Sequence, residues 1–174
     1  PMRSSAASDV YKRQVTNNIT KSEVDDLLTD TNGKITVDFI TEDKSDLSTI
    51  NDNTNVILST ANITVTDTTT LDNAEDINRY TTGEVTLNIV SDKFANVQAI
   101  HELKPTTDGG NGVNLSGALI TITDPVSHDQ ASTANNFTTA LVTLNSVEDD
   151  YVNLVKIIET SNTQLDMSDA SIRV

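Results

Sequence analysis

A glycine-rich segment holds the clearest candidate for chemistry in this chain. Residues Gly109–Leu115 read GGNGVNL, which approximates one turn of the G-G-x-G-x-D-x-apolar repeat that binds calcium. Asp108, Asn111 and Asn114 would supply the oxygen ligands. Such sites need successive turns to complete the oxygen cage, and Asn114 stands where the repeat has Asp. The segment predicts either a calcium site at these three residues or, as the favoured interpretation, an inter-repeat loop that tolerates insertions.

Paired acidic residues are a second candidate, at Asp25–Asp26, Glu42–Asp43 and Asp149–Asp150. A glycosidase would need one such carboxyl group in a cleft that raises its pKa. Carboxylates near the start of a helix are also favoured by the positive end of the helix dipole. Because the sequence around them suggests no cleft, we expect these acids to cap helices.

His101 and His128 are the two histidines, and neither belongs to an HExxH motif. The sequence also lacks the GxSxG, GxxxxGK[ST] and GxGxxG patterns of hydrolases and of phosphate-binding loops. A Ser–His–Asp arrangement stays open, because its members need not be neighbours in sequence. The motifs therefore predict a protein that is not an enzyme and that has no obligatory cofactor.

Charge and composition exclude several classes of partner. The 174 residues include 11 Lys+Arg and 26 Asp+Glu, for a net charge of −15. Nucleic acids and anionic membranes need clustered basic residues, so neither is an expected partner. The sequence has no apolar run of about 18 residues, the minimum for a membrane-spanning helix. The absence of cysteine excludes disulfides and Cys-based zinc sites.

The residue types that dominate the chain indicate many short elements. Threonine occurs 27 times, and Asp and Asn together occur 37 times. Threonine suits strands through its branched Cβ atom, whereas Asp and Asn suit turns and helix caps. Low hydrophobicity and high charge also permit disorder. The regular apolar patterning described below favours a folded chain with a thin Val/Ile/Leu core.

The first fourteen residues differ from the rest. They contain three of the eleven basic residues and lack the Thr/Asn texture that begins at Val15. The segment SSAASDVYKRQ (residues 4–14) resembles translated sequencing-adapter sequence. We therefore expect residues 1–14 to be a non-native or disordered leader and the remainder to be part of a longer protein.

The chain after residue 14 contains an internal repeat. At a shift of 57 residues, 21 of the 45 positions from Val56 to Ile100 are identical to those from Val113 to Ile157. A weaker copy matches at a shift of 50. We predict a degenerate first repeat over 15–61, a second over 62–118, a third over 119–170, and the start of a further repeat at 171–174.

Each unit begins with a strand that alternates apolar residues and threonine, Ile63–Thr66 or Ile120–Thr123. We expect Asp67 and Asp124 to cap the helix that follows, with Pro125 at its first position. In the first unit, Thr20 and Glu23 have the spacing of a capping box.

A TNG or TTG turn is expected to close this helix, with Gly33 and Gly83 in the left-handed conformation. The second half of each unit is predicted to be a strand and a helix. The predicted strands are Ile35–Phe39, Val85–Ile89 and Leu141–Leu144, and the predicted helices run through Phe94, Val97 and Ile100 and through Tyr151, Leu154 and Ile158.

Alternating strands and helices with short links imply an α/β fold with parallel strands and short helices. Both a closed sheet and an open array of strand–helix repeats of about 50–57 residues fit this pattern. Tandem identity favours the open, solenoid-like array, because stacked units bury one another's apolar faces. We expect the matched aromatic residues, Tyr80 with Phe137 and Phe94 with Tyr151, in the core. The strand threonines are expected to form a flat ladder on the solvated face of the sheet: Thr64, Thr66, Thr86, Thr121, Thr123 and Thr143.

The segments ITVTD (63–67), TTGEVT (81–86), ITITD (120–124) and TTALVT (138–143) resemble repeats of very large cell-surface, adhesin-like proteins of aquatic bacteria, cyanobacteria among them. The resemblance implies an extracellular, non-catalytic spacer module whose partners are adjacent repeats of the same chain. Calcium-binding nonapeptide repeats often accompany this family. The alternative is therefore a module that binds calcium, a surface glycan or a protein through its acidic inter-repeat loops.

Overall fold

The computed structural model describes residues 12–103, 112–159 and 164–174. Within these ranges seven main strands alternate with six helices, and a short strand precedes three of the main strands. The main strands are β1 (Arg13–Ile19), β2 (Ile35–Glu42), β4 (Asn62–Thr69), β5 (Val85–Asp92), β7 (Leu119–Val126), β8 (Val142–Glu148) and β10 (Ser171–Arg173). The helices are α1 (Lys21–Asp30), α2 (Lys44–Asn51), α3 (Leu71–Asn78), α4 (Phe94–Glu102), α5 (His128–Asn135) and α6 (Tyr151–Glu159). The short strands are β3 (Val56–Ile57), β6 (Val113–Asn114) and β9 (Leu165–Asp166).

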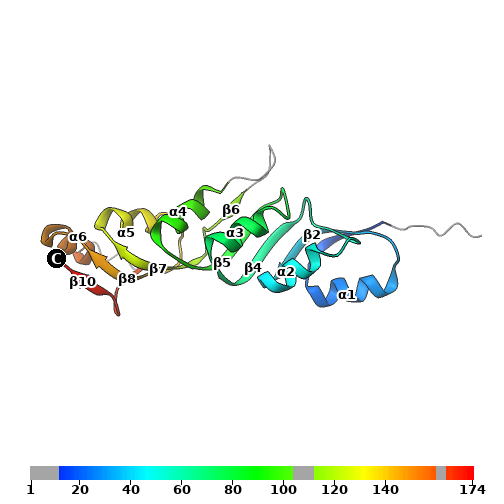
Figure 1. Cartoon of the computed structure of the whole chain (residues 1–174), viewed down its shortest axis with the longest axis horizontal. Helices are drawn as coiled ribbons and strands as arrows, with labels where there is room; N and C mark the ends of the chain where they lie inside the picture. The colour runs from blue at the N-terminus through cyan, green and yellow to red at the C-terminus, as the bar shows by residue number, and fades with distance from the viewer. Residues whose placement is uncertain (1–11, 104–111, 160–163) are drawn as a thin grey trace, which may run out of the picture.

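All ten strands belong to one parallel sheet, which confirms the predicted α/β class and the parallel pairing. The order of the main strands, β1-β2-β4-β5-β7-β8-β10, is their order in the sequence, so each strand–helix coil lies beside the next. The short strands pair with the beginnings of β2, β5 and β8. The sheet is open, because its edge strands β1 and β10 lie toward opposite ends of the long axis (Figure 1).

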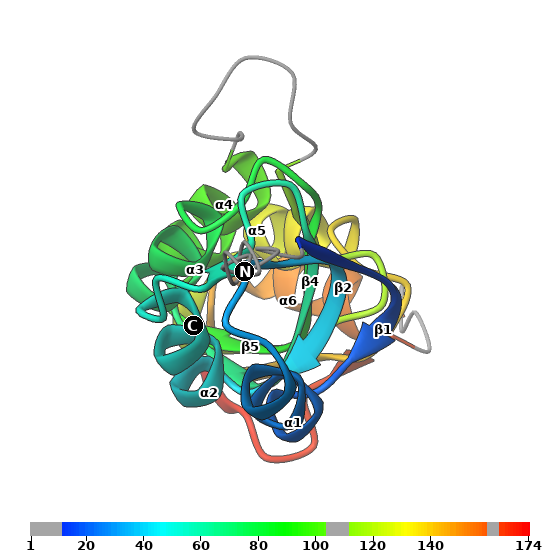
Figure 2. The ribbon, with the colours of Figure 1, turned by 90° about the vertical axis from the view of Figure 1, so that its right-hand side faces the viewer.

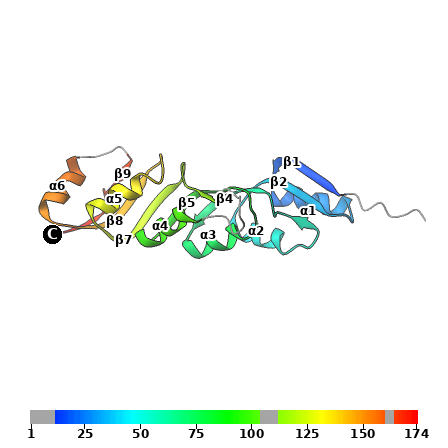
Figure 3. The same ribbon diagram turned by 90° about the horizontal axis from the view of Figure 1, so that it is seen from above.

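The core lies between the sheet and the helices. Alternate strand residues such as Ile63, Val65 and Leu87 are buried against the helices, whose buried side chains include Val97 and Ile100. Figure 3 shows α2, α3 and α4 along one side of the strands. The opposite face of the sheet carries the threonines. None of the helices in the described ranges is long and apolar enough to cross a membrane.

The whole array twists about its long axis. Figure 2 shows α1, α2, α3 and α4 at successively different angles around this axis. Neighbouring strands of a sheet are rotated by about 20–25°, so six strand-to-strand steps accumulate to about 120–150°. The face that carries the threonines is therefore curved along its length rather than flat.

The prediction that Asp67 and Asp124 cap the following helix is wrong. The helices begin later, with Thr70 and Ser127 as N-caps. The strands continue to these caps through an irregularity in the pairing, between Val65 and Thr68 and between Ile122 and Pro125. Pro125 is accordingly a strand residue of β7, not the first residue of a helix. A proline is tolerated at a bulge because one ladder hydrogen bond is already missing there.

The prediction of left-handed conformations at Gly33 and Gly83 is also wrong, since Gly112 is the one described residue with a positive φ. Gly83 instead leaves room for the close approach of the previous coil, whereas the equivalent turn of the third repeat accommodates Ala140. A Cβ atom on Gly83 would lie 2.2 Å from the carbonyl oxygen of Ala61 in the previous coil. The Thr81 hydroxyl, in a side chain that is 2% exposed, donates to this same Ala61 oxygen and accepts from the N–H of Gly83 at 2.8 Å.

Two further predictions are confirmed, and the structure departs from prediction at two other places. The capping box of Thr20 and Glu23 is present at α1, and Phe94 and Phe137 are buried as expected. Tyr151, which matches Phe94 in the repeat, is exposed. β1 begins at Arg13, inside the segment 1–14 that the composition sets apart.

We predict that Gly83→Ala destabilises the protein by about 1–3 kcal/mol. The new Cβ atom would clash with the backbone oxygen of Ala61, which cannot move aside as the end of a flexible side chain could. For a chain of this size the melting temperature should fall by about 2–10 °C, measurable by circular dichroism. Gly117→Ala is the matched control, since nothing lies within 4 Å of the Cβ position there. Equal melting temperatures for the two variants would contradict the packing argument.

Candidate functional site

A row of carboxylates runs along the edge of the sheet where the strands end. It consists of Glu42, Asp67, Asp92, Asp124 and Asp149, and we call it the carboxylate ladder. Each member lies at or near the end of a main strand and accepts a hydrogen bond from the first N–H of the helix in the preceding coil. The ladder is thus an inter-coil contact that repeats along the array.

The contacts of the ladder are short and uniform. Asp67 accepts from the N–H of Lys44 in α2 at 3.0 Å, and Asp124 accepts from the N–H of Phe94 in α4 at 2.7 Å. Both acids belong to the ITVTD and ITITD segments. The bulge in each strand places the Asp so that it caps the preceding coil rather than its own helix. Glu42 serves α1 in the same way, through the N–H of Lys21.

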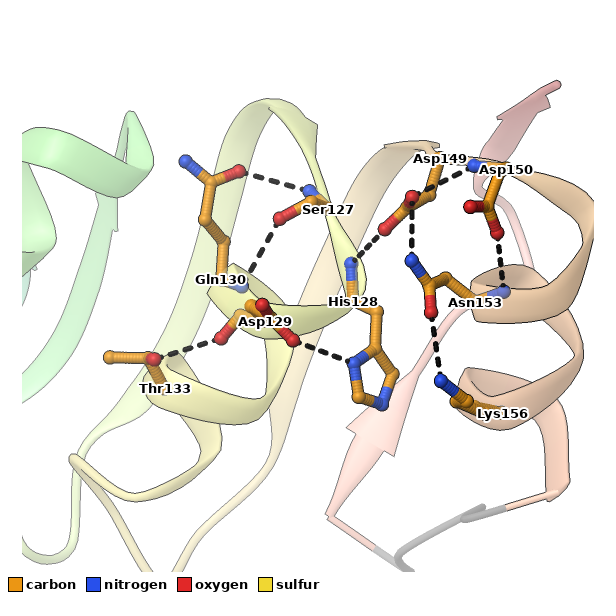
Figure 4. A network of polar contacts seen from close by, with 9 residues as sticks. All are labelled: Ser127, His128, Asp129, Gln130, Thr133, Asp149, Asp150, Asn153 and Lys156. Carbon is orange, nitrogen blue, oxygen red and sulfur yellow. Dashed lines mark hydrogen bonds and ion pairs between the residues drawn. The ribbon is translucent and has the colours of Figure 1, made fainter.

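Asp92 and Asp149 bridge two coils with one side chain. Oδ2 of Asp92 accepts from the Leu71 N–H at 3.0 Å, while its Oδ1 accepts from the Lys93 N–H and the Asn96 amide. Figure 4 shows the same pattern around Asp149, whose partners are the N–H groups of His128 and Asp150 and the side chain of Asn153.

These hydrogen bonds set the charge state of both acids. Burial by itself raises the pKa of Asp92, but the hydrogen bonds from Leu71, Lys93 and Asn96 stabilise the carboxylate and hold the pKa below its ordinary value. The pKa of Asp149 is likewise lowered, chiefly by the His128 N–H and then by Asn153. A general acid needs the opposite shift. Asp92 and Asp149 are therefore suited to holding helix starts rather than to donating protons.

The structure describes one of the three calcium candidates. Asp108 and Asn111 lie outside the described residues. Asn114 is described, and its amide is occupied: Oδ1 accepts from the Ser116 N–H at 2.9 Å, and Nδ2 donates to Glu84 at 3.2 Å. In the described ranges no group of three or more His, Asp or Glu side chains is arranged to hold a metal ion. The calcium site stays a prediction.

A groove of about 530 Å³ between α5 and α6 is a second candidate site. His128 and Ser132 line it from α5, and Ile157 lines it from α6. The Nδ1 atom of His128 lies 3.0 Å from the carboxylate of Asp129, which resembles two members of a triad. The Asp129 side chain is 97% exposed, however, so solvent screens the pair and leaves the imidazole weakly oriented. His101, in contrast, stacks on Phe137 at 4.4 Å and is a packing residue.

The open face of the sheet carries two rows of hydroxyl side chains in register. Thr41, Thr64 and Thr86 are paired across β2, β4 and β5. The second row consists of Ser91, Thr121 and Thr143 across β5, β7 and β8. The predicted threonine ladder is therefore confirmed for Thr64, Thr86, Thr121 and Thr143, whereas Thr66 and Thr123 fall in the irregularities of the strand pairing. Its rows lie on the twisted sheet, so they suit a curved or small contact better than an extended flat one.

The role of the ladder acids escaped the sequence analysis, although a signal for it exists. Asp67 and Asp124 follow a threonine at the same point of the repeat, and Asn17 follows Thr16 at the corresponding point of β1, three residues before the N-cap. A strict spacing of three residues from Asp to the N-cap distinguishes these acids from the caps themselves.

We predict that Asp92→Asn reduces stability by about 1 kcal/mol at neutral pH, because a charge-assisted bond to the start of α3 becomes a neutral one. The folded pKa of Asp92 is lowered, so its contribution is complete above the unfolded pKa of about 3.9 and is lost as the pH falls through the folded value. In urea unfolding between pH 3 and 7, the free energy of unfolding should fall less with decreasing pH for the variant than for the wild type. Asp72→Asn, which removes an exposed charge from the first turn of α3, is the control. Identical pH profiles for the wild type and Asp92→Asn would contradict the assignment.

The chain was compared with protein-family models, with curated proteins and with solved structures, and none of the three comparisons gave a match. No function is therefore transferred to the ladder, the groove or the threonine face from a relative. The geometry of the described residues is the basis on which a function is inferred.

Proposed function

We propose that this chain is a non-catalytic structural module, a solenoid-like array of strand–helix coils that acts as a spacer in a large extracellular bacterial surface protein. The observation that carries the proposal is the carboxylate ladder. Five successive helices are each capped from the following coil, so the polar contacts of the array couple neighbours instead of converging on a single site. Such nearest-neighbour coupling is the energetic signature of a repeat array.

The distribution of charge and shape supports the same role. The molecule is elongated along the stacking direction of its strands (Figure 1), as a spacer requires. A net charge of −15 opposes association between parallel arrays, since like charges repel and keep such proteins apart. The bacterial cell-surface location rests on the resemblance of the repeat segments and is part of the proposal.

The first test removes one repeat. Deleting residues 62–118 joins Ala61 to Leu119 in the register of the 57-residue repeat. We predict a folded protein that unfolds cooperatively and is shorter by about two strand spacings, or about 10 Å along the sheet. Small-angle X-ray scattering measures the length, and circular dichroism measures the melt. Deleting 62–119 is the matched control, because the missing residue shifts the apolar alternation to the wrong face. Unfolding of the in-register deletion would count against a modular array.

The second test separates the spacer from the calcium-binding alternative. A ligand present at a hundred times its dissociation constant adds about 2.7 kcal/mol to stability, which corresponds to a melting shift of about 5–10 °C for this length. We predict the same melting temperature in millimolar calcium and in excess chelator, because the side-chain amide of Asn114 is already hydrogen-bonded to Ser116 and Glu84. A calcium-specific rise that magnesium does not reproduce would favour the alternative and make the loop at Asp108, Asn111 and Asn114 functional.

A further inference from the structure

The groove between α5 and α6 is lined by side chains that differ from their counterparts in the second repeat. At the shift of 57 residues, Ser132 and Asn136 stand where α3 has Glu75 and Arg79. In α3 these two long side chains form an ion pair at 3.4 Å. Two short, uncharged side chains replace this pair in α5, and both of them line the groove of about 530 Å³.

One wall of the groove is polar, and its groups both donate and accept hydrogen bonds. Ser132, Asn135 and Asn136 line this wall from α5, together with His128. Figure 4 shows the imidazole of His128 between α5 and α6. Its Nδ1 atom faces the Asp129 carboxylate at 3.0 Å, so Nε2 is the acceptor of the neutral ring. The hydroxyl group and the two amides add donors as well as acceptors.

The side chain of Asn135 contains an unsatisfied atom beside the groove. Its Oδ1 atom is buried and has no hydrogen-bond partner in the described part of the chain. Buried polar atoms of native proteins are nearly always hydrogen-bonded, so each exception calls for an explanation. Because Asn135 lines the groove, a ligand that donates a hydrogen bond to this oxygen would satisfy it.

The opposite wall of the groove is apolar. Ile157 of α6, which is 2% exposed, and the half-buried Leu165 of β9 form this wall. No Lys or Arg side chain is found among the described residues that line the groove. A fitting ligand therefore has one apolar face, one edge that both donates and accepts hydrogen bonds, and no negative charge. A pyranose ring meets these conditions, since its C–H groups form an apolar face and each of its hydroxyl groups donates and accepts.

We propose that the groove between α5 and α6 binds a neutral pyranose sugar. The sugar hydroxyl groups bond to Asn135 Oδ1, His128 Nε2 and the Ser132 hydroxyl, while the C–H face of the ring packs on Ile157 and Leu165. The site lies between two helices, apart from the acidic loop at Asp108–Asn114. It adds a binding activity to the spacer, and the spacer proposal does not depend on it.

An NMR titration of the isotope-labelled full chain with N-acetylglucosamine, glucose and galactose tests the proposal. We expect at least one of these sugars to shift the backbone signals of α5 and the side-chain amide signal of Asn135 saturably. The dissociation constant should be millimolar, as for other ligands of about a dozen non-hydrogen atoms in open grooves. Methyl glycosides of the binding sugar then separate two sources of ligand. Equal binding of a methyl glycoside indicates a residue within a glycan, and loss of binding indicates a free sugar.

Three variants locate the sugar. Ser132→Glu combined with Asn136→Arg restores the residues of α3 and should weaken binding by about tenfold or more, because the long side chains fill the groove. Thr133→Asp is the matched control, since it restores Asp76 of α3 at a position of α5 outside the groove lining, and it should bind like the wild type.

Asn135→Ala should weaken binding several-fold without lowering the melting temperature, because it removes a buried oxygen that has no partner in the described structure. An asparagine with a purely structural role would show the reverse, with a lower melting temperature and unchanged binding.

Three results would overturn the proposal. The first is the absence of a saturable shift with any of the three sugars. The second is an equal response to glycerol or inorganic phosphate, which would mark an unspecific polar surface. The third is binding that the double variant leaves unchanged, which would place the sugar elsewhere. If the double variant melts earlier than the wild type, Asn135→Ala decides, and unchanged binding in that variant overturns the assignment.

Discussion

The first N–H groups of a helix have no acceptor within the helix, and a strand–helix array places all of these groups at the edge where its strands end. An acceptor must be found there for every helix. For α1 to α5 it comes from the following coil, as the carboxylate of Glu42, Asp67, Asp92, Asp124 or Asp149. The rest of the architecture is consistent with this constraint. The strands are parallel, they follow the sequence order, and bulges in β4 and β7 bring Asp67 and Asp124 to the required position.

A row of like charges would ordinarily destabilise such an edge. Each helix start carries a partial positive charge of about half a unit, which offsets the carboxylate placed against it. Asp92 shows how far this compensation goes, because N–H groups from two coils surround its carboxylate. The acidic composition is therefore partly structural. The acids of the ladder hold coils together, whereas acids on the outer helix faces, such as Asp129, remain in solvent.

The turns at Thr81–Gly83 and Thr138–Ala140 likewise satisfy backbone groups of a neighbouring segment, at the opposite edge of the sheet. Thr81 and Thr138 are buried, and their hydroxyl groups donate to the carbonyl oxygens of Ala61 and Ala118, which lie directly before β4 and β7. The N–H of Gly83 or Ala140 is satisfied by the same hydroxyl. Both edges thus use side chains of one coil to complete the backbone of its neighbour, so neither coil is fully satisfied alone.

The sequence predicted the fold class, the parallel pairing and most helices, because apolar periodicity and the internal repeat report directly on burial. The positions of Asp67, Asp124 and Pro125 were wrong for a physical reason. A bulge extends the strand by residues that resemble a cap, and local propensity does not distinguish an Asp that caps its own helix from one that caps another. The exposure of Tyr151 was missed because register equivalence with the buried Phe94 reports the position in the repeat and not the side chains that surround it.

The direction of the ladder has a consequence for synthesis. Each of the helices α1 to α5 receives its carboxylate from a residue that lies later in the chain. In three of them the distance is 21 residues: Lys21 from Glu42, Leu71 from Asp92 and His128 from Asp149. A ribosome makes the N-terminal end first, so every helix leaves the exit tunnel before the group that completes it. Folding along the array is therefore expected to lag translation by one coil. Each newly made strand then locks the helix behind it, in a one-way sequence that proceeds toward the C-terminus.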